Sequence, residues 1–359
     1  MIELDRTKIT INLKALLSNL KYASALAPGK KIMSVIKADG YGHGAVKVAK
    51  TLSASNSFAV ARLEEAEDLR SAGLSSPVCV LEGVSSERDL KRARELGLQL
   101  VVHSPYQIYL YKKHGSSLPI WLKIDSGMGR LGFSIPQFSE VLNSLKGLNL
   151  IGIISHLSHA DDISSNRTEE QLQILSEEIL PLAKKEKLEF NLANSAGLLG
   201  WENSLSDWIR PGLMLFGVSP FSDFKSREDL LPCMTFSAPI IAVKDIKRGQ
   251  SVGYGGIFTA FENTRIAIVA AGYADGFPRE IEQGAPILIN GKRFPLVGRV
   301  SMDLICVEIK NSRIEPGDIA ILWGDLLPVE EVARYAKTIP YTLLTGISSR
   351  VRREFLEET

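Results

Sequence analysis

Cysteine is scarce in this chain of 359 residues, and the chain carries almost no excess charge of either sign. The three cysteines, Cys79, Cys233 and Cys306, are odd in number and widely spaced, so they fit reduced thiols and not a disulfide scaffold. Lys and Arg total 42 and Asp and Glu total 41, which leaves a net charge of +1. This balance argues against nucleic acid or an anionic membrane as a binding partner.

Long hydrophobic runs are also missing. No apolar stretch approaches the roughly 20 residues that a membrane-spanning helix needs. Residues 1–6 lack the apolar core of a targeting segment, so we expect a cytoplasmic protein. The content of 45% hydrophobic and 23% charged residues is ordinary for a globular protein. The length suits two domains, or one barrel with a smaller partner domain.

Apolar strand-like segments alternate with amphipathic helices from about residue 30 to about residue 216. The expected helices include residues 63–70 and a longer one at residues 169–187. Eight strands with crossover helices are the number that a (β/α)8 barrel requires. The expected strands are residues 31–36, 58–61, 77–81, 98–102, 119–124, 148–155, 189–192 and 208–216.

A doubly wound open sheet would also fit this alternation. Polar residues, however, cluster at the first, fifth, sixth, seventh and eighth expected strands. In a barrel these strand ends converge on one face, whereas in an open sheet they would be spread along an edge. The sequence therefore predicts a TIM-like (β/α)8 barrel, with residues 1–230 as its domain.

The pattern changes after about residue 230. Helical periodicity stops, and short β-rich segments follow, separated by turns such as Asn290-Gly291 and Pro316-Gly317. One helix is expected near residues 329–337. The sequence therefore predicts a mostly β C-terminal domain over residues 231–359. Its expected strands are residues 238–243, 265–270, 286–289, 294–297, 304–308 and 319–322.

A lysine follows the first expected barrel strand. Lys37 stands at the end of an apolar run and opens a bend that reads Lys-Ala-Asp-Gly-Tyr-Gly-His-Gly. A buried ammonium group is costly unless its pKa falls or it reacts. A lysine in this place suits a Schiff base with a carbonyl cofactor. A lysine whose amine reaches solvent at the barrel rim is the simpler alternative.

The fifth and sixth expected strands also lead to candidate site residues. Lys123 faces the barrel interior if its neighbours face outward, and Arg130 follows on a loop, where it could bind a carboxylate or form only a surface ion pair. His156 suits a base, a metal ligand or a ring that stacks on a planar cofactor. The spacing of His156, His159 and Asp161 matches no standard zinc pattern, so we expect no metal.

The seventh and eighth expected strands lead to a candidate phosphate site. Residues 194–197 could open a helix with free N–H groups, or Ser195 could be a plain helix cap. The eighth strand carries Arg210-Pro211-Gly212, and barrels usually bind phosphate in the loops after strands seven and eight. Two glycine-containing loops of the β domain, residues 251–256 and 298–303, either lie against another surface or are simple turns.

Taken in order, these motifs resemble the alanine racemase family, which comprises pyridoxal-phosphate enzymes built from a barrel and a β domain. The resemblance covers nearly the whole chain. Eight separate matches in the same order are far more specific than any one of them. The matching segments are residues 35–44, 123–132, 156, 194–197, 210–212, 252–255, 272–276 and 298–303.

The resemblance implies that L-alanine and D-alanine are interconverted by two bases, and that D-alanine is supplied for cell-wall peptidoglycan. Lys37 would be one base and would also bind pyridoxal 5'-phosphate as a Schiff base. Tyr254 would be the other base and would come from the second chain of a homodimer. The implied catalytic residues are Lys37, Tyr254, Arg130, Arg210 and His156. The resemblance also places Arg210 and His156 at the cofactor ring. The phosphate would be held by Tyr41, Ser195, Gly212 and Leu213, and the substrate by Arg130, Met302 and Asp303. Lys123 would be carbamylated, and the path into the site would be lined by Asp161, Arg279 and Arg299.

Several alternatives stay open. A racemase of another small amino acid such as serine is one, because a methylene or hydroxyl group is worth only about 1–3 kcal/mol in such a pocket. A fold-related amino-acid decarboxylase is disfavoured by Arg210, because those enzymes place a carboxylate beside the pyridine nitrogen. A non-catalytic pyridoxal-phosphate carrier is disfavoured by the β domain. Ser349 stands where several family members carry a tyrosine that reaches the phosphate, so Ser349 either bonds the phosphate directly or the contact is missing.

Overall fold

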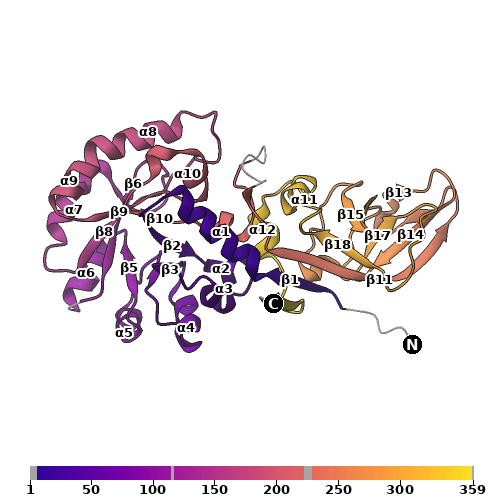
Figure 1. The fold of residues 1–359 in the computed structure, drawn as a ribbon, viewed down its shortest axis with the longest axis horizontal. Helices are drawn as coiled ribbons and strands as arrows, with labels where there is room; N and C mark the ends of the chain where they lie inside the picture. The colour runs from indigo at the N-terminus through magenta and orange to yellow at the C-terminus, as the bar shows by residue number, and fades with distance from the viewer. Residues whose placement is uncertain (1–5, 115–116, 222–228, 358–359) are drawn as a thin grey trace. The chain divides into compact units, whose positions relative to one another are not determined.

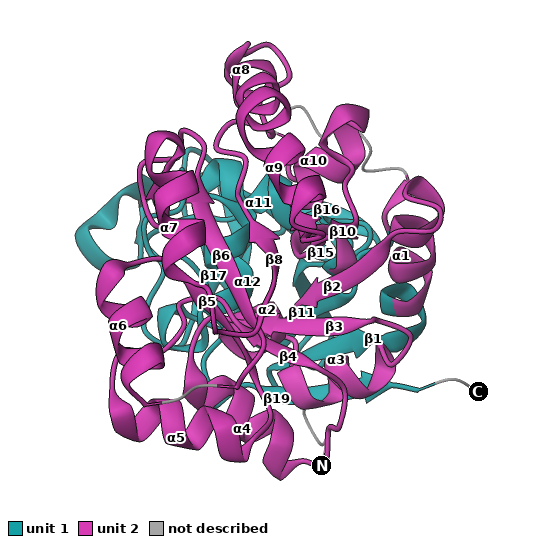
Figure 2. Ribbon diagram, turned by 90° about the vertical axis from the view of Figure 1, so that its left-hand side faces the viewer, with its two compact units in different colours: residues 1–16, 216–218, 231–359 teal, residues 17–215, 219–230 magenta. Residues whose placement is uncertain are grey.

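The computed structural model describes residues 6–114, 117–221 and 229–357 and divides into two compact units (Figure 2). The first, called here the barrel unit, comprises residues 17–215 and 219–230. The second, the β unit, comprises residues 1–16, 216–218 and 231–359. Each unit has its own sheet and its own buried side chains.

Eight strands close the barrel, and the predicted (β/α)8 fold is confirmed (Figures 1 and 2). Each strand pairs in parallel with two neighbours, and β10 pairs with β2 to complete the ring. Strand β3 is buried along its whole length, which explains why such strands read as continuous apolar runs. The short strand β7 (Phe133–Ser134) pairs with β6 beside the ring. The barrel strands are β2 (Lys31–Val35), β3 (Ser57–Val60), β4 (Val78–Val80), β5 (Gln99–Val102), β6 (Ile120–Asp125), β8 (Leu150–Ile154), β9 (Glu189–Asn191) and β10 (Trp208–Ile209).

Amphipathic helices cover the barrel strands (Figure 2). Helix α5 (Glu87–Glu95) buries Leu90 and Ala93, and its N-terminus is capped by Ser86, whose Oγ accepts a hydrogen bond from the Asp89 N–H at 3.0 Å. The other helices are α1 (Leu13–Leu26), which begins in the β unit, α2 (Lys37–Tyr41), α3 (Ala45–Thr51), α4 (Leu63–Ser71), α6 (Pro105–Lys113), α7 (Phe138–Ser144), α8 (Arg167–Ile174), α9 (Leu180–Lys185) and α10 (Ser195–Gly200).

The long helix expected at residues 169–187 begins at Arg167 and is interrupted. A π-helical turn, Leu175–Ile179, separates α8 from α9, and the Leu180 N–H bonds the Leu175 carbonyl five residues back. Pro181 follows at once and has no N–H to continue the regular ladder. The expected helical segment is present, and Pro181 accounts for the interruption within it.

The β unit is mostly β, as predicted. Its strands pair antiparallel, apart from the parallel pair β1–β19. A hairpin of β12 (Ser251–Val252) and β13 (Phe258–Thr259) stands apart from the main sheet. The main strands are β1 (Lys8–Asn12), β11 (Met234–Ile246), β14 (Thr264–Val269), β15 (Pro286–Ile289), β16 (Lys292–Pro295), β17 (Ile305–Glu308), β18 (Ile319–Trp323) and β19 (Arg352–Leu356), with helices α11 (Val329–Tyr335) and α12 (Pro340–Thr345).

The N-terminal strand β1 belongs to the β unit, although the sequence analysis assigned residues 1–230 to the barrel. It pairs antiparallel with β11 and parallel with β19, and it buries Ile9 and Ile11. Both partner strands lie at the other end of the chain, so no local pattern in the first 16 residues indicates this pairing.

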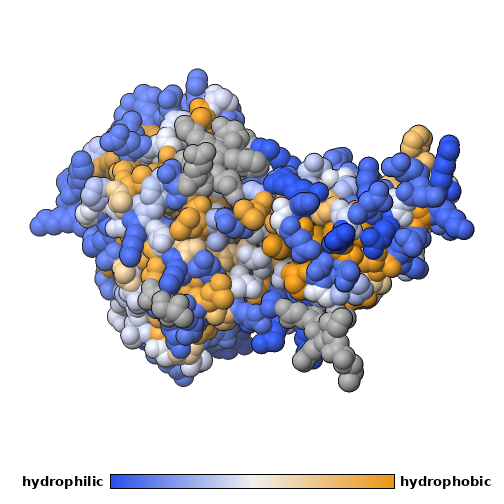
Figure 3. All heavy atoms as spheres, turned by 45° about the vertical axis from the view of Figure 1, so that its right-hand side comes forward, coloured by the Kyte–Doolittle hydropathy of each residue, from blue (hydrophilic) through white to orange (hydrophobic). Residues whose placement is uncertain are grey.

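In the part of the chain that the structure describes, no helix combines the length and the apolar character needed to cross a lipid bilayer. The face shown in Figure 3 is largely hydrophilic, with smaller hydrophobic patches between the polar side chains.

Candidate functional site

Lys37 opens a turn whose backbone is unusual. Ala38, Asp39, Gly40 and Tyr41 all have left-handed φ angles, at 52°, 54°, 62° and 53°. This conformation costs about 1–2 kcal/mol for each residue other than glycine. Such backbone strain is found mainly where a function requires it. The strained backbone is therefore a second reason, besides the lysine, to place a candidate site at the end of β2.

The amine of Lys37 is surrounded by charged groups. Burial lowers its pKa, and the cations of Arg130 and Arg210 lower it further, against the opposing effect of Glu65 and Glu82. A larger fraction of this amine is neutral than of an ordinary lysine. A neutral amine can act as a nucleophile or as a base.

Arg210 lies directly after β10 with its side chain buried. Among the described residues its guanidinium donates to acceptors that are all uncharged: the Ser155 O (2.8 Å), His156 Nδ1 (3.0 Å), the Leu192 O (3.3 Å), the Asn191 O (3.4 Å) and Asn191 Oδ1. Burial lowers its pKa to about 10, so it stays charged at neutral pH. The guanidinium is thus fixed in direction while its charge is left uncompensated.

His156 follows β8 and contacts Arg210. Because arginine has only donors, Nδ1 of His156 must accept this hydrogen bond. Burial and then the Arg210 cation hold the pKa of His156 well below its usual range. The imidazole is therefore neutral and carries its proton on Nε2.

Lys123 and Arg130 come from β6 and the loop after it. Burial, then Arg210 and Arg130, hold the pKa of Lys123 well below that of an ordinary lysine. The loop is shaped by Asp125, whose Oδ1 accepts from the N–H groups of residues 127–129 at 2.9, 2.8 and 3.1 Å. Arg130 is exposed at the end of this turn.

Tyr41, Ser195 and Gly212 lie together. The buried Ser195 Oγ accepts from the N–H of Gly212 at 3.0 Å and from the N–H of Met214 at 3.2 Å. A Cβ on Gly212 would lie only 2.5 Å from the Tyr41 hydroxyl. A bare glycine is therefore required where the backbone approaches this tyrosine. Leu213, which follows, is buried.

Three loops that the sequence singled out in the β unit also come together. Tyr273 and Ala274 donate to the carbonyls of Ser301 and Met302 at 3.1 and 2.9 Å, which joins residues 272–276 to residues 298–303. A Cβ on Gly298 would lie 2.8 Å from the Val252 carbonyl, which brings in residues 252–255.

The side chains on these loops are largely exposed. Tyr254 is 70% exposed and Met302 53% exposed. Asp303 is held by Arg350, which donates to it at 2.7 Å and also donates to the buried Asp275 at 2.7 Å. The other candidates, Arg279, Arg299 and Asp161 of the barrel unit, are exposed as well. Arg279 forms an ion pair with Glu280.

Three polar residues that contact the site were missed by the sequence analysis. Asn191 bonds Arg210 from β9, within the strand expected at residues 189–192. Gln171 joins Ser126, the His156 carbonyl and Ser158, and Glu65 bonds the turn after Lys37. Asn191 could have been recognised from the sequence, because a polar side chain within a barrel strand breaks its apolar pattern. Gln171 and Glu65 lie on amphipathic helices, where polar residues are ordinary.

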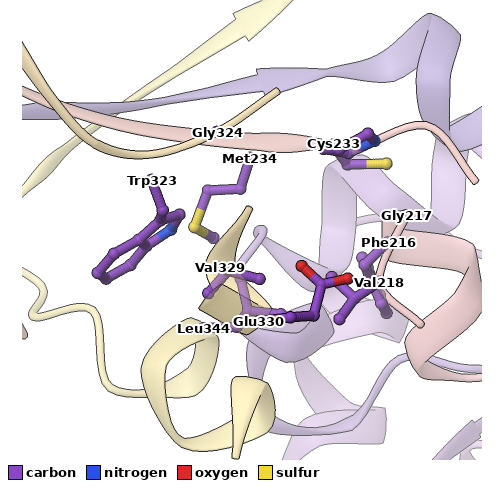
Figure 4. A pocket seen from close by; sticks show the side chains of 11 residues that line it. Phe216, Gly217, Val218, Cys233, Met234, Trp323, Gly324, Val329, Glu330 and Leu344 are labelled. Carbon is purple, nitrogen blue, oxygen red and sulfur yellow. The ribbon is translucent and has the colours of Figure 1, made fainter. Parts of the chain in front are cut away.

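The described part of the β unit also contains a cavity of about 10 Å³, lined by residues that include Met234, Trp323, Glu330 and Leu344 (Figure 4). This volume is enough for about one water molecule. It is too small for an amino acid, so it is no candidate for an active site.

The barrel thus carries a lysine of lowered pKa, two arginines and a buried serine hydroxyl held by two backbone amides at the C-terminal ends of its strands, where barrel enzymes have their active sites. This arrangement defines a barrel enzyme with a cationic site.

Comparisons with known proteins give the family. The N-terminal domain of alanine racemase matches residues 11–220, and its C-terminal domain matches residues 233–355. An alanine racemase of Coxiella burnetii (strain CbuG_Q212) is 44% identical over 367 residues, 99% of this chain and 99% of that protein. The structure of alanine racemase from Acinetobacter baumannii has a TM-score of 0.91 at 38% identity and covers 98% of this chain and 99% of its own. That of Bartonella henselae, with covalently bound pyridoxal phosphate, has a TM-score of 0.89 at 26% identity and covers 98% and 100%. This chain belongs to the alanine racemase family, a family of isomerases.

Proposed function

We propose that this protein interconverts L-alanine and D-alanine with pyridoxal 5'-phosphate as its cofactor. The observation that carries the proposal is the amine of Lys37, whose lowered pKa makes it available as a nucleophile and a base beside two arginines. Family membership supplies the class of reaction, and Lys37 is the residue suited to perform it.

The residues of the barrel unit fit this cofactor. The hydroxyl groups of Ser195 and Tyr41 offer donors for the phosphate beside the backbone of Gly212 and Leu213, in a place that a Cβ would fill. Arg210 would lie at the pyridine nitrogen, supported by His156. When bound, the cofactor would withdraw electrons from the α-carbon of the substrate and stabilise the negative charge that remains after proton removal.

Racemisation needs a second base on the opposite face of the α-carbon. One base removes the α-proton and the other delivers a proton from the far side, so the substrate does not have to turn over. We assign this role to Tyr254 of the second chain of a homodimer. The assignment is supported by the exposure of the large side chains of Tyr254, Met302 and Leu304 on the β unit, which leaves them available to a second chain.

The substrate carboxylate would be bound by Arg130, with Met302 and Asp303 of the partner chain lining the pocket. Carbamylation of Lys123 is part of the proposal. Carbon dioxide reacts only with a neutral amine, and the pKa of Lys123 lies well below that of an ordinary lysine. The carbamate would carry a negative charge toward Arg130. Asp161, Arg279 and Arg299 are assigned to the path into the site.

Racemisation is favoured over decarboxylation. The uncharged acceptors around Arg210 leave its cation intact, and a cation beside the pyridine nitrogen disfavours the protonated ring that a decarboxylase needs. We further propose that the enzyme works in the cytoplasm and that its D-alanine serves cell-wall peptidoglycan. Nucleic acid and membranes are not proposed as partners.

Mixing two inactive variants tests the shared site. Lys37→Ala and Tyr254→Phe should each lose nearly all racemisation of L-alanine in the presence of pyridoxal phosphate. After subunit exchange, each heterodimer should hold one doubly defective site and one intact site, so activity should return with the time of exchange. Each variant mixed with itself is the control.

Heterodimers verified by native mass measurement but still inactive would contradict the two-chain assignment. The same assay on L-serine and other small amino acids, with detection of amine products, tests the substrate and the decarboxylase alternative. Faster turnover of serine than of alanine would replace the proposed substrate.

A further inference from the structure

We propose that Glu65 is a positioning residue, which fixes the left-handed turn after Lys37 and thereby the direction of the Lys37 amine. The inference rests on the proposed function only in that Lys37 is the reactive amine. Glu65 itself lies on α4, in a different part of the chain, and none of the roles assigned above includes it.

The carboxylate of Glu65 joins the ends of two neighbouring barrel strands. Its Oε1 accepts from the Ala38 N–H at 2.5 Å, directly after Lys37. Its Oε2 accepts from the N–H groups of Ala61 at 2.7 Å and Arg62 at 3.0 Å, directly after β3. One side chain thus binds the turn that follows β2 to the turn that follows β3.

The chemistry of the three donors requires a carboxylate. All three groups are backbone N–H donors, and they approach both oxygens of the side chain. A glutamine would present its NH2 group to one of the two sets of donors, so it can satisfy only one of them. An aspartate is one methylene shorter and cannot span the same two turns.

The turn needs such support because its backbone is intrinsically unfavourable. Ala38 and Asp39 hold left-handed φ angles of 52° and 54° although neither is glycine. The bond from Ala38 to Glu65 fixes the first of these residues. Lys37 is the preceding residue, so a change of the backbone at Ala38 would redirect its side chain.

A narrower role is also compatible with the contacts at Oε2. Those bonds form a capping box at the start of α4, so Glu65 could serve that helix alone. The two roles differ in a testable way. Replacing Ala38 by glycine removes the steric cost of the left-handed conformation at residue 38 but does nothing for the N-terminus of α4.

Hydrogen exchange followed by mass spectrometry on the full chain without cofactor separates the roles. The proteins compared are the parent, Glu65→Gln, Ala38→Gly, the double variant of both, and Glu64→Gln as the matched control. Glu64 lies in the same first turn of α4 and is exposed, so Glu64→Gln removes the same charge without touching the turn after Lys37. The peptides to follow are residues 38–44 and residues 63–71.

We expect Glu65→Gln to speed exchange in residues 38–44 about 10-fold to 100-fold, the range for loss of a hydrogen bond to a charged group. Glu64→Gln should leave this segment within twofold of the parent. In the double variant, Ala38→Gly should reverse most of the increase. Borohydride trapping of pyridoxal phosphate at Lys37 should be slower in Glu65→Gln than in the double variant, because both lack the Glu65 charge that raises the pKa of Lys37 and they differ only at residue 38.

Unchanged exchange in residues 38–44 of Glu65→Gln would overturn the proposal, as would an increase that Ala38→Gly does not reverse. If Glu65→Gln does not fold, Glu65→Asp carries the same comparison, because it keeps the charge but cannot span both turns. The exchange measurement needs neither substrate nor cofactor. The result of the exchange measurement can therefore be interpreted even if the protein proves to have no racemase activity.

Discussion

Replacing Ser195 by alanine removes an acceptor that two backbone amides share. The Ser195 Oγ accepts from the N–H of Gly212 at 3.0 Å and from the N–H of Met214 at 3.2 Å, and all three residues are buried. Alanine has no atom that can take over either bond. Ser195→Ala therefore tests whether these amides, which we assign to the phosphate site, depend on the serine hydroxyl.

The magnitude follows from the two orphaned donors. Leaving a buried N–H without a partner costs about 1–3 kcal/mol, so two of them give about 2–6 kcal/mol. Water that enters the space left by the hydroxyl reduces this cost. We expect the free energy of unfolding to fall by about 2–4 kcal/mol, in the lower part of that range.

Ser204→Ala is the matched control. Ser204 is also buried, but its hydroxyl has no hydrogen-bond partner among the described residues. Its removal should cost less than about 1 kcal/mol, because it orphans no other group. Urea unfolding of the cofactor-free chain, followed by tryptophan fluorescence, measures both variants. Three of the four tryptophans, Trp121, Trp201 and Trp208, lie in the barrel unit and report on it. Equal midpoints for the two variants would refute the role given to Ser195.

Three further predictions concern the charged groups. Lys37→Met should raise the thermal midpoint at neutral pH. Because the pKa of Lys37 is lower in the folded than in the unfolded chain, the parent gains stability as pH rises between these two pKa values, so its midpoint should approach that of the variant. A difference in midpoint between variant and parent that widens as pH rises would contradict this. Asn191→Ala should lower the free energy of unfolding by about 1.5–3 kcal/mol, the value of a hydrogen bond to a charged group such as Arg210, and a loss in urea below about 0.5 kcal/mol would count against it. Arg350→Met should raise KM for alanine more than it lowers kcat, because Asp303, which we assign to the substrate pocket, loses its hydrogen-bond partner. An unchanged KM in steady-state kinetics would show that Arg350 does not position Asp303 for substrate binding.

The barrel could be predicted from the sequence because most of its strands lie in short apolar segments bounded by turns. The predicted segments at residues 31–36 and 119–124 overlap β2 and β6 almost completely, and residues 286–289 coincide with β15 in the β unit. What could not be predicted depends on partners distant in the chain. Strand β1 is ordinary in sequence, and only its pairing with β11 and β19 places it in the β unit.

The same division holds for the candidate site. Lys37 could be named as a candidate because a charged residue at the end of an apolar strand breaks the pattern. Arg210 could be named because it interrupts the apolar segment 208–216, of which only Trp208–Ile209 forms a strand. Glu65 and Gln171 could not be named, because polar residues on amphipathic helices are expected wherever the helix faces solvent. Their contacts depend on side-chain direction, which sequence spacing does not specify. The left-handed angles from Ala38 to Tyr41 were also hidden, because only Gly40 among the four is a residue that favours them.

The missed residues determine how the predicted ones behave. Asn191 and the carbonyls around Arg210 satisfy its donors without a negative charge, so the cation of Arg210 acts at full strength on Lys37, Lys123 and His156. A carboxylate in the place of Asn191 would orient the guanidinium equally well. It would also cancel the contribution of Arg210 to these three lowered pKa values, which adds to the larger effect of burial, and the amine of Lys37 would be protonated more often. The uncharged surroundings of Arg210 therefore contribute to the lowered pKa of Lys37, on which the role proposed for its amine depends.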